Sequence, residues 1–231
     1  MTLILHELAA AEEDRRFSPY CWRTRMALAH KGLEAERVPW RFTDTGVIAP
    51  SGQGRVPVLV DDGRWLSDSW VIADHLEAAY PDRPSLFGGA VGRALAHFVG
   101  QWVEGVIHPR LFRMIACDVH AHLADRDKDY FRTSRERRIG MSLEAFAADR
   151  DTRREGFRRS LDPARAALAA RPYLSGDAPA YADYVLFGAF QWARCISPYR
   201  ILDADDPLHA WRARLLGLYD GLAGKALGYP C

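Results

Sequence analysis

The feature that most constrains the fold is a change of pattern part-way along the 231-residue chain. Residues 1–82 alternate between short apolar segments and helical segments, as in a small α/β domain. The stretch Pro81–Gly89 holds two prolines and two glycines, which are typical of a connection. Beyond it, apolar residues recur at helical spacing almost to the end. The sequence therefore predicts an α/β domain over 1–82, a linker over 83–89 and an all-helical domain over 90–231.

The first domain is expected to contain a small mixed sheet with flanking helices. The predicted elements are a strand Leu3–His6, a polar loop Glu7–Phe17, a helix Pro19–His30, a strand Glu36–Trp40, a loop Arg41–Gly54 with at most one helical turn, a hairpin Pro57–Leu66 and a helix Ser69–Tyr80. The hairpin turns at Asp61-Asp62-Gly63, an Asp-Gly turn signal.

The second domain is expected to begin with a long helix, Ala90–Ala121, that is kinked at Pro109, because proline removes a backbone hydrogen bond. The further predicted helices are Asp129–Arg150, Arg153–Ala170, Tyr181–Ile196 and Pro207–Leu222. Asp125–Asp129 is expected to be a charged loop. Arginines alternate with acids over Arg132–Arg138, which indicates a solvated helix face.

Composition excludes several classes of function. No apolar run reaches the roughly 20 residues of a membrane helix, and the first residues indicate a strand rather than a signal peptide. A net charge of +1 argues against a nucleic-acid or anionic-membrane partner. The cysteines and histidines lack metal-ligand spacing, so no metal is expected. Cys21, Cys117, Cys195 and Cys231 are scattered, which favours free thiols and a cytoplasmic location.

A helix start at Ser18-Pro19 is the first candidate site. A hydroxyl residue directly before proline is typical of an N-cap followed by the first helical residue. The free amides and positive dipole end of such a helix favour an anion, for example a thiolate. The Ser18 hydroxyl would donate to the same anion. A simple helix cap is the alternative interpretation.

Val56-Pro57, at the start of a strand, is the second candidate site. A cis bond there would turn the Val56 backbone outward, to pair with a peptide-like ligand as an added strand does. On its own, the pattern favours an ordinary trans proline, since cis is the rarer isomer.

Asp68-Ser69 opens the next helix and is the third candidate site. Free amides at a helix start hold a carboxylate, and the Asp68 charge suits an ammonium group. Together they would fit the α-amino-acid end of a ligand. Plain N-capping is the alternative, and it is the more common arrangement.

The three sites occur in this order on the expected elements, and in this arrangement the chain resembles the glutathione transferase superfamily. The segments 18–24, 55–63 and 68–73 are most similar to a bacterial branch that holds the β-etherases of lignin breakdown and related fungal-type transferases. The resemblance implies a thioredoxin-like N-terminal domain, an all-helical C-terminal domain, glutathione as cosubstrate and a twofold homodimer. It departs from the superfamily at Ala180, where Ser or Thr commonly precedes Asp183, so the local capping box is incomplete.

The resemblance also implies residue roles in glutathione binding. Ser18 would face the sulfur, Val56 would pair with the cysteinyl backbone beside cis-Pro57, and Asp68 and Ser69 would hold the γ-glutamyl end. For the glycyl carboxylate the sequence offers Arg41, Gln53 and Arg55. Gln53 and Arg55 are preferred because they lie closest to the Val-Pro strand.

The electrophile is expected to bind against the helical domain. The candidate lining residues are Tyr20, His108, Leu111, Phe112 and Ile115, with Trp102, Trp192 and Tyr199 as weaker aromatic candidates. A histidine at a kink is more often a structural hydrogen-bonding group, and aromatic residues at helical spacing are more often core.

Ser18-Pro19-Tyr20-Cys21 also resembles the Cys-Pro-Tyr-Cys site of glutaredoxins. Without the first cysteine the usual dithiol exchange is impossible, and Cys21 is expected to be a packing residue. The resemblance to the transferases implies transfer of glutathione to an aromatic electrophile, and the resemblance to the bacterial branch implies β-aryl ether cleavage as the specific reaction. The alternatives are a general detoxifying transferase, a glutathione peroxidase, and a non-catalytic glutathione-binding or scaffold module.

Overall fold

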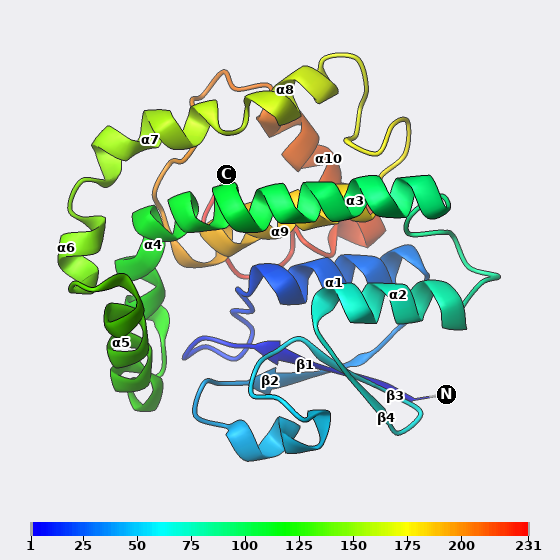
Figure 1. The fold of residues 1–231 in the computed structure, drawn as a ribbon, viewed down its shortest axis with the longest axis horizontal. Helices are drawn as coiled ribbons and strands as arrows, with labels where there is room; N and C mark the ends of the chain where they lie inside the picture. The colour runs from blue at the N-terminus through cyan, green and yellow to red at the C-terminus, as the bar shows by residue number, and fades with distance from the viewer. Residues whose placement is uncertain (1, 231) are drawn as a thin grey trace.

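The computed structural model describes residues 2–230, so Cys231 lies outside the described part of the chain. Its N-terminal domain is built on a four-stranded sheet in the order β2-β1-β3-β4 (Figure 1). The strands are β1 (Leu3–Leu8), β2 (Glu36–Trp40), β3 (Val58–Asp61) and β4 (Arg64–Ser67). β1 and β2 are parallel, while β3 is antiparallel to both β1 and β4. The predicted mixed sheet and its hairpin are confirmed.

Two helices, α1 (Pro19–His30) and α2 (Ser69–Ala79), lie between this sheet and the helical domain (Figure 1). A 3₁₀ helix, η1 (Thr45–Ser51), lies on the opposite side of the sheet. It is longer than the single turn expected in the loop 41–54. The Val56–Pro57 peptide bond is cis, as the resemblance implies.

The C-terminal domain is helical, and its helix α9 packs directly on α1 of the first domain (Figure 1). Its elements are α3 (Ala90–Trp102), a π-helical turn η2 (Val103–Ile107), α4 (His108–His122), α5 (Asp125–Ile139), α6 (Leu143–Ala147), α7 (Arg150–Arg159), α8 (Asp162–Leu168), α9 (Tyr181–Ile196) and α10 (Leu208–Gly221). The thioredoxin-like sheet followed by an all-helical domain is thus confirmed. No helix of the described chain is long and apolar enough to cross a membrane.

The expected loop from Glu7 onward is wrong at its start, because β1 continues to Leu8. Glu7 is fully buried and lies 3.5 Å from Arg25 Nε and 3.7 Å from Arg16 Nη1. A buried carboxylate is tolerated when cations accompany it. Because these partners are distant in sequence, a local pattern does not show them, and the charge of Glu7 by itself wrongly indicates a loop.

The two helices predicted over 129–150 and 153–170 are wrong, because four shorter helices, α5 to α8, occupy this region. Gly140 ends α5 with φ of +76°, and Ser142 caps α6 by accepting from the N–H of Ala145 at 3.2 Å. The expected charged loop at Asp125 is also wrong. Asp125 and Asp127 lie in the first turn of α5, where the helix dipole favours negative charge.

The irregularity expected at Pro109 lies one turn earlier, in η2. The N–H of His108 donates to the carbonyl of Val103, five residues back, as in a π-helix. Proline lacks an N–H, so a normal ladder cannot continue through Pro109. The wider turn lets the helix proceed directly into α4.

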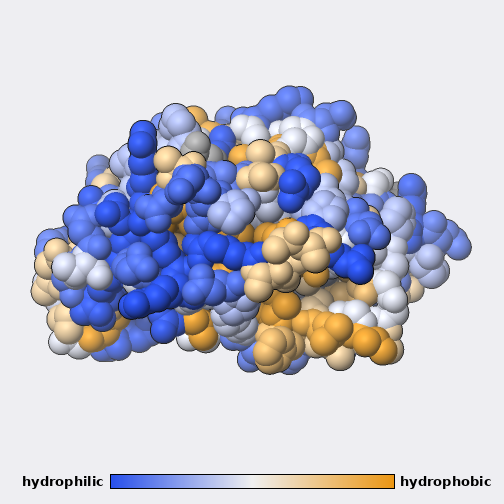
Figure 2. Space-filling model, turned by 90° about the horizontal axis from the view of Figure 1, so that it is seen from above, coloured by the Kyte–Doolittle hydropathy of each residue, from blue (hydrophilic) through white to orange (hydrophobic). Residues whose placement is uncertain are grey.

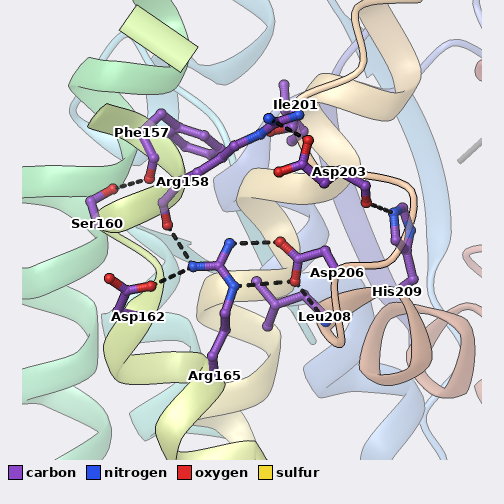
Figure 3. A network of polar contacts seen from close by, with 10 residues as sticks. All are labelled: Phe157, Arg158, Ser160, Asp162, Arg165, Ile201, Asp203, Asp206, Leu208 and His209. Carbon is purple, nitrogen blue, oxygen red and sulfur yellow. Dashed lines mark hydrogen bonds and ion pairs between the residues drawn. The ribbon is translucent and has the colours of Figure 1, made fainter. Parts of the chain in front are cut away.

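Arg165 ties the outer helices to the loop before α10 (Figure 3). Its Nε and Nη2 donate to the two carboxylate oxygens of the buried Asp206 at 3.2 and 2.6 Å, and its Nη1 donates to Asp162 and to the carbonyl of Arg158. Asp206 in turn accepts from the N–H of Leu208 at 2.9 Å. This network fixes the start of α10, which is helical as predicted up to an irregular segment at Leu218–Asp220.

Asp183 compensates for the missing hydroxyl at Ala180. Only half of the capping box forms. Asp183 accepts from the N–H of Ala180 at 3.3 Å, but alanine has no side-chain oxygen that could accept from the N–H of Asp183. The buried carboxylate also accepts from the N–H groups of Leu174 and Ser175 and from Trp211 Nε1. It therefore anchors the loop before α9 and joins α9 to α10.

Candidate active site

A cleft of about 690 Å³ lies between the two domains. Its N-terminal side includes the loop that ends in Ser18, the start of α1, and the segment Gly54–Val56. Its other side is formed by η2, α4, α5, α6 and α9. The lining side chains of this helical side are Glu104, His108, Pro109, Phe112, Val119, Tyr130, Phe131, Arg135, Arg138, Ile139, Phe146 and Trp192. Most of this surface is aromatic or aliphatic, so the cleft suits a ring-bearing molecule.

Ser18 caps α1 and lines this cleft. Its Oγ accepts from the N–H of Cys21 at 3.3 Å, and its hydroxyl can donate either to the neighbouring Cys21 sulfur or to a ligand in the cleft. The side chain is buried at 4% exposure, so a partner there is largely shielded from water. Cys21 is buried beneath it, and burial raises the pKa of this thiol to about 12. It is therefore a packing residue, not a reactive thiolate.

Val56 presents a free backbone beside the cis bond. It lies outside the strands, and its N–H and C=O make no hydrogen bond to another described backbone group. Val56 also lines the cleft. The arrangement suits the pairing that the resemblance implies for a peptide-like ligand.

Asp68 and Ser69 open α2 but are not part of the cleft lining. Asp68 Oδ1 accepts from the N–H groups of Trp70 and Val71 at 2.7 and 3.2 Å, so it caps the helix. Its other carboxylate oxygen has no hydrogen-bond partner in the described chain, and the residue is exposed. Burial raises the pKa of Tyr20, which lines the cleft. The charges of Arg23 and Arg55 lower this pKa, whereas those of Glu104 and Asp68 raise it. Asp68 is therefore close enough to affect the electrostatic potential in the cleft.

The three candidates for binding the glycyl carboxylate differ in whether their side chains are already engaged by other groups and in whether they line the cleft. Arg41 donates to the carbonyls of Ala10 and Ala11 at 3.2 and 3.3 Å, which engages its guanidinium. Gln53 donates from Nε2 to the carbonyl of Arg55 at 2.7 Å and does not line the cleft. Arg55 is exposed, lines the cleft and has no ion-pair partner among the described residues.

His108 is an uncharged part of the helical wall. Burial, with the nearby charge of Arg23, lowers the pKa of His108 to about 3. Its ring makes edge contacts with Tyr20 at 5.3 Å and with Trp192 at 5.8 Å between centroids. Its Nε2 is buried and has no hydrogen-bond partner in the described structure. The imidazole therefore offers one neutral polar atom within an aromatic surround.

Two of the predicted lining residues of α4 do not reach the cleft. Phe112 lines it and stacks on Trp192 at 5.9 Å, but Leu111 and Ile115 are fully buried and absent from its lining. Their placement in the electrophile site is wrong, because they belong to the packed interior of the domain. Trp192 lines the cleft, whereas Trp102 and Tyr199 do not, and the Tyr199 hydroxyl donates to Asp151 at 2.7 Å.

One ion pair joins the domains at the edge of the cleft. Arg23 of α1 donates from Nη1 to Glu104 of η2 at 2.7 Å, and Arg23 is 3% exposed. Its guanidinium also lies over the Tyr20 ring at 4.7 Å. Glu104 is the only carboxylate in the cleft lining of the described chain, and this pair neutralises it.

Sequence reasoning missed the contribution of α5. Tyr130, Phe131, Arg135 and Arg138 all line the cleft, although this segment was expected to be a solvated face. The spacing of Phe131, Arg135 and Arg138 (i, i+4, i+7) is the available signal, since it places them on one helix face. Phe17, Trp40, Phe42 and Phe146 complete the aromatic lining that went unpredicted.

A second cavity, of about 860 Å³, lies between β1, β2, α1 and the C-terminal segment. Its charged residues are Glu7, Asp14, Asp220, Arg16, Arg25, Arg37 and Lys225. The charges of both signs nearly balance, so this cavity has no clear ligand preference. No group of three or more acidic, histidine or cysteine side chains within residues 2–230 is arranged to hold a metal ion.

Family models agree with both domains. Residues 17–79 match the model for the glutathione S-transferase N-terminal domain, and residues 94–210 match a model for the C-terminal domain. The chain belongs to the glutathione S-transferase family. It is accordingly a glutathione S-transferase family enzyme.

Relatives of this transferase are found in fungi and bacteria. The glutathione S-transferase-like protein ustS of Aspergillus flavus is 29% identical over 216 residues, which cover 78% of this chain and 75% of that protein. A maleylacetoacetate isomerase of Pseudomonas aeruginosa is 36% identical over 96 residues, which cover 38% of this chain and 45% of that protein.

A solved structure of a glutathione S-transferase from Ceriporiopsis subvermispora in complex with glutathione superposes with a TM-score of 0.82. It is 23% identical, covers 95% of this chain and 97% of its own, and thus supports the fold. The glutathione transferase GSTFuA3 of Phanerochaete chrysosporium superposes with a TM-score of 0.77 at 25% identity, over 96% of this chain and 92% of its own.

Proposed function

We propose that this transferase binds glutathione with its sulfur at Ser18 and that the thiolate attacks an aromatic electrophile held in the cleft. The observation that carries the proposal is the position of Ser18. It caps the start of α1 and lines a largely aromatic cleft between the two domains. A nucleophile held at this point would meet a molecule bound against Phe112 and Trp192.

The role proposed for Ser18 is to donate a hydrogen bond to the thiolate. A free thiol has a pKa near 8.5, so at neutral pH only a few per cent is ionised. A charge-assisted hydrogen bond contributes about 1.5–3 kcal/mol, equivalent to lowering the thiol pKa by roughly one to two units. The N-terminus of α1 adds to this effect. Ser18 forms no covalent bond itself.

In the rest of the glutathione site, Val56 would pair with the cysteinyl backbone next to cis-Pro57. Asp68 and Ser69 would hold the γ-glutamyl end. Arg55 is favoured over Gln53 for the glycyl carboxylate, because it is the charged and unpaired group that faces the cleft. Tyr20, His108 and Phe112 would contact the electrophile.

The specific reaction proposed is β-aryl ether cleavage. The sulfur would form a bond to the carbon next to a ketone, the ether C–O bond would break, and the phenoxide would leave and take a proton from water. The products are a glutathione thioether and a phenol, with no net oxidation. The aromatic lining of the cleft supports a ring-bearing substrate, and the choice of an aryl ether follows from the resemblance described for segments 18–24, 55–63 and 68–73.

Replacing the serine tests the proposed role. Ser18→Ala is expected to lower kcat/KM by roughly 10- to 100-fold and to raise the pKa of bound glutathione, followed by thiolate absorbance, by about one to two units. Cys117→Ala, at a cysteine of α4 that does not line the cleft, is the control and is expected to change neither quantity. Unchanged values in Ser18→Ala would contradict the assignment.

A substrate panel separates the alternatives. An aryl ether ketone, chlorodinitrobenzene and cumene hydroperoxide test for the β-etherase, the general detoxifying transferase and the peroxidase. Glutathione binding by calorimetry without turnover of any of them would indicate a non-catalytic module. The expected cytoplasmic location also stays a prediction.

The homodimer is proposed to form through α3. Val91, Leu95 and Phe98 are 76%, 62% and 72% exposed and recur at i, i+4 and i+7, which places them on one face of the helix. Val71 of α2 is also exposed. Figure 2, which views the molecule from above, shows hydrophobic surface gathered at its lower right, the side on which α3 lies in Figure 1. Such a patch is typical of an association surface.

A further inference from the structure

We infer that the electrophile of this enzyme carries a carboxylate, which Arg135 and Arg138 of α5 receive. The inference rests on the proposed function, since it concerns the molecule that the glutathione thiolate attacks. It names a substrate class, aryl electrophiles with an anionic substituent, and two residues that determine specificity for it.

The first observation is the charge of the cleft. The charged side chains in its lining are Arg55, Glu104, Arg135 and Arg138. Glu104 is paired with Arg23, whereas none of the three arginines forms an ion pair within the described chain. A neutral substrate would leave this excess of positive charge uncompensated, so the cleft favours an anionic occupant.

The second observation is the position of the two α5 arginines on the aromatic lining. The guanidinium of Arg135 lies over the rings of Phe131 and Phe42, at 4.8 and 5.2 Å from their centroids. That of Arg138 lies over Phe112 at 5.8 Å. Because Phe112 also stacks on Trp192, the guanidinium of Arg138 lies next to the aromatic wall of the cleft. A flat ring against this wall would place a ring substituent within reach of a guanidinium.

The third observation is that Arg135 is partly desolvated. It is half-buried, and its guanidinium donates to Ser134 Oγ at 2.8 Å and to the Tyr130 hydroxyl, so its partners are neutral groups. Burial, followed by the charge of Arg138, lowers the pKa of Arg135, and the contact with Tyr130 offsets only part of this effect. An anion between the two arginines would remove this cost and gain charge-assisted hydrogen bonds.

Arg55 has a different role in this arrangement. It follows Gly54 and precedes Val56, on the side of the cleft where glutathione is proposed to bind. One arginine is enough for the glycyl carboxylate, which leaves the α5 pair for the second substrate. The cleft would thus separate two carboxylates, one on each reactant.

The experiment uses 4-chloro-3-nitrobenzoate and its methyl ester, which differ in one negative charge. In either reaction the glutathione sulfur bonds to the ring carbon, the C–Cl bond breaks, chloride leaves and the thiol proton passes to solvent. Each catalysed rate is divided by the uncatalysed rate of the same substrate, because the ester group activates the ring toward attack more than the carboxylate does. The affinities of the two S-aryl glutathione products are measured by calorimetry, so the result does not depend on fast turnover.

The double variant R135Q/R138Q is expected to lose roughly tenfold in kcat/KM for the carboxylate and in affinity for its glutathione conjugate. Values for the methyl ester and its conjugate, and the Kd of glutathione, are expected to change less than about twofold, since neither involves the lost contact. Arg137→Gln is the matched control, because Arg137 is exposed on α5 between the two and does not line the cleft.

Three results would overturn the inference. Equal losses for acid and ester would indicate a structural role, and a raised Kd for glutathione would assign the arginines to the cosubstrate. If the double variant keeps the wild-type ratio of kcat/KM for acid and ester, the two arginines contact neither the substrate carboxylate nor glutathione. Failure of the proposed function is distinguishable, because the wild-type protein would then bind no glutathione, or would bind it and turn over neither the acid nor the ester.

Discussion

His108 illustrates how a single side chain takes its chemical character from its surroundings. It lies in α4 against Tyr20 and Trp192, and burial with the charge of Arg23 keeps it neutral by lowering its pKa to about 3. A neutral imidazole cannot act as a cationic acid at physiological pH. In the cleft it is therefore an aromatic surface with one polar atom.

This neutrality predicts a pH dependence of stability. Between pH 6.5 and about 3 the unfolded chain binds a proton at this histidine that the folded protein does not. The contribution of His108 is thus complete above pH 6.5 and is lost as the pH falls, at about 1.4 kcal/mol per pH unit. His108→Phe is expected to remove this slope, a difference of about 2 kcal/mol at pH 5.

Urea unfolding of both proteins at pH 7, 6 and 5 measures the effect. Met114→Leu, at a buried residue of the same helix that carries no titrating group, is the control and is expected to leave the slope unchanged. If the free energies of unfolding of wild type and His108→Phe decrease equally from pH 7 to pH 5, His108 is protonated in the folded protein as well.

Individual residues differ in how far the sequence can assign them. Ser18 and Asp68 are predictable as helix caps because each stands directly before a helix. The cis bond after Val56 is implied by the resemblance alone, since the local pattern favours trans. Arg135 and Arg138 are not, because alternation with acids resembles a solvated face. Their role becomes visible in the structure, where Arg135 lies over Phe131 and Phe42 and Arg138 lies over Phe112.

The same distinction holds for the elements. The helices Pro19–His30 and Tyr181–Ile196 are predicted to the residue, since proline or a cap starts the first and the second is apolar throughout. The region from α5 to α8 is not, because its helices are short and strongly polar. Their ends depend on tertiary contacts such as those of Arg165.

The contact between α1 and α9 yields the next prediction. A Cβ added at Gly188 of α9 would lie 2.4 Å from the carbonyl oxygen of Pro19, so the helices approach closely there. Gly188→Ala is expected to lower the free energy of unfolding by about 1–3 kcal/mol. It is also expected to reduce kcat/KM by about tenfold or more, since it displaces the turn that follows Ser18.

Gly156→Ala provides the comparison. Gly156 lies within α7 with nothing within 4 Å of an added Cβ, so this change is expected to stabilise the protein by about 0.5–1 kcal/mol. Urea unfolding and steady-state kinetics measure both variants. A destabilised Gly188→Ala protein with normal kcat/KM would show that α9 moves and α1 does not.

At the scale of the whole molecule, the cleft is shared between the two domains of the chain. Residues of both domains line it, and the Arg23–Glu104 ion pair joins them at its edge. The apolar face of α3 is separate from this lining, since none of its exposed residues belongs to the cleft. Association through α3 would therefore contribute to stability without supplying a catalytic group.

This separation leads to a prediction about assembly and activity together. Phe98→Glu places a charge in the centre of the proposed dimer surface, where burial without a partner is expected to weaken association by about 3 kcal/mol, or roughly a hundredfold. Light scattering should then detect a monomer at micromolar concentration, with kcat per chain unchanged. Met141→Glu, at an exposed apolar residue between α5 and α6, is expected to remain a dimer. A dimeric Phe98→Glu protein would place the interface elsewhere, and a monomer that loses kcat would show that the partner chain supports the cleft.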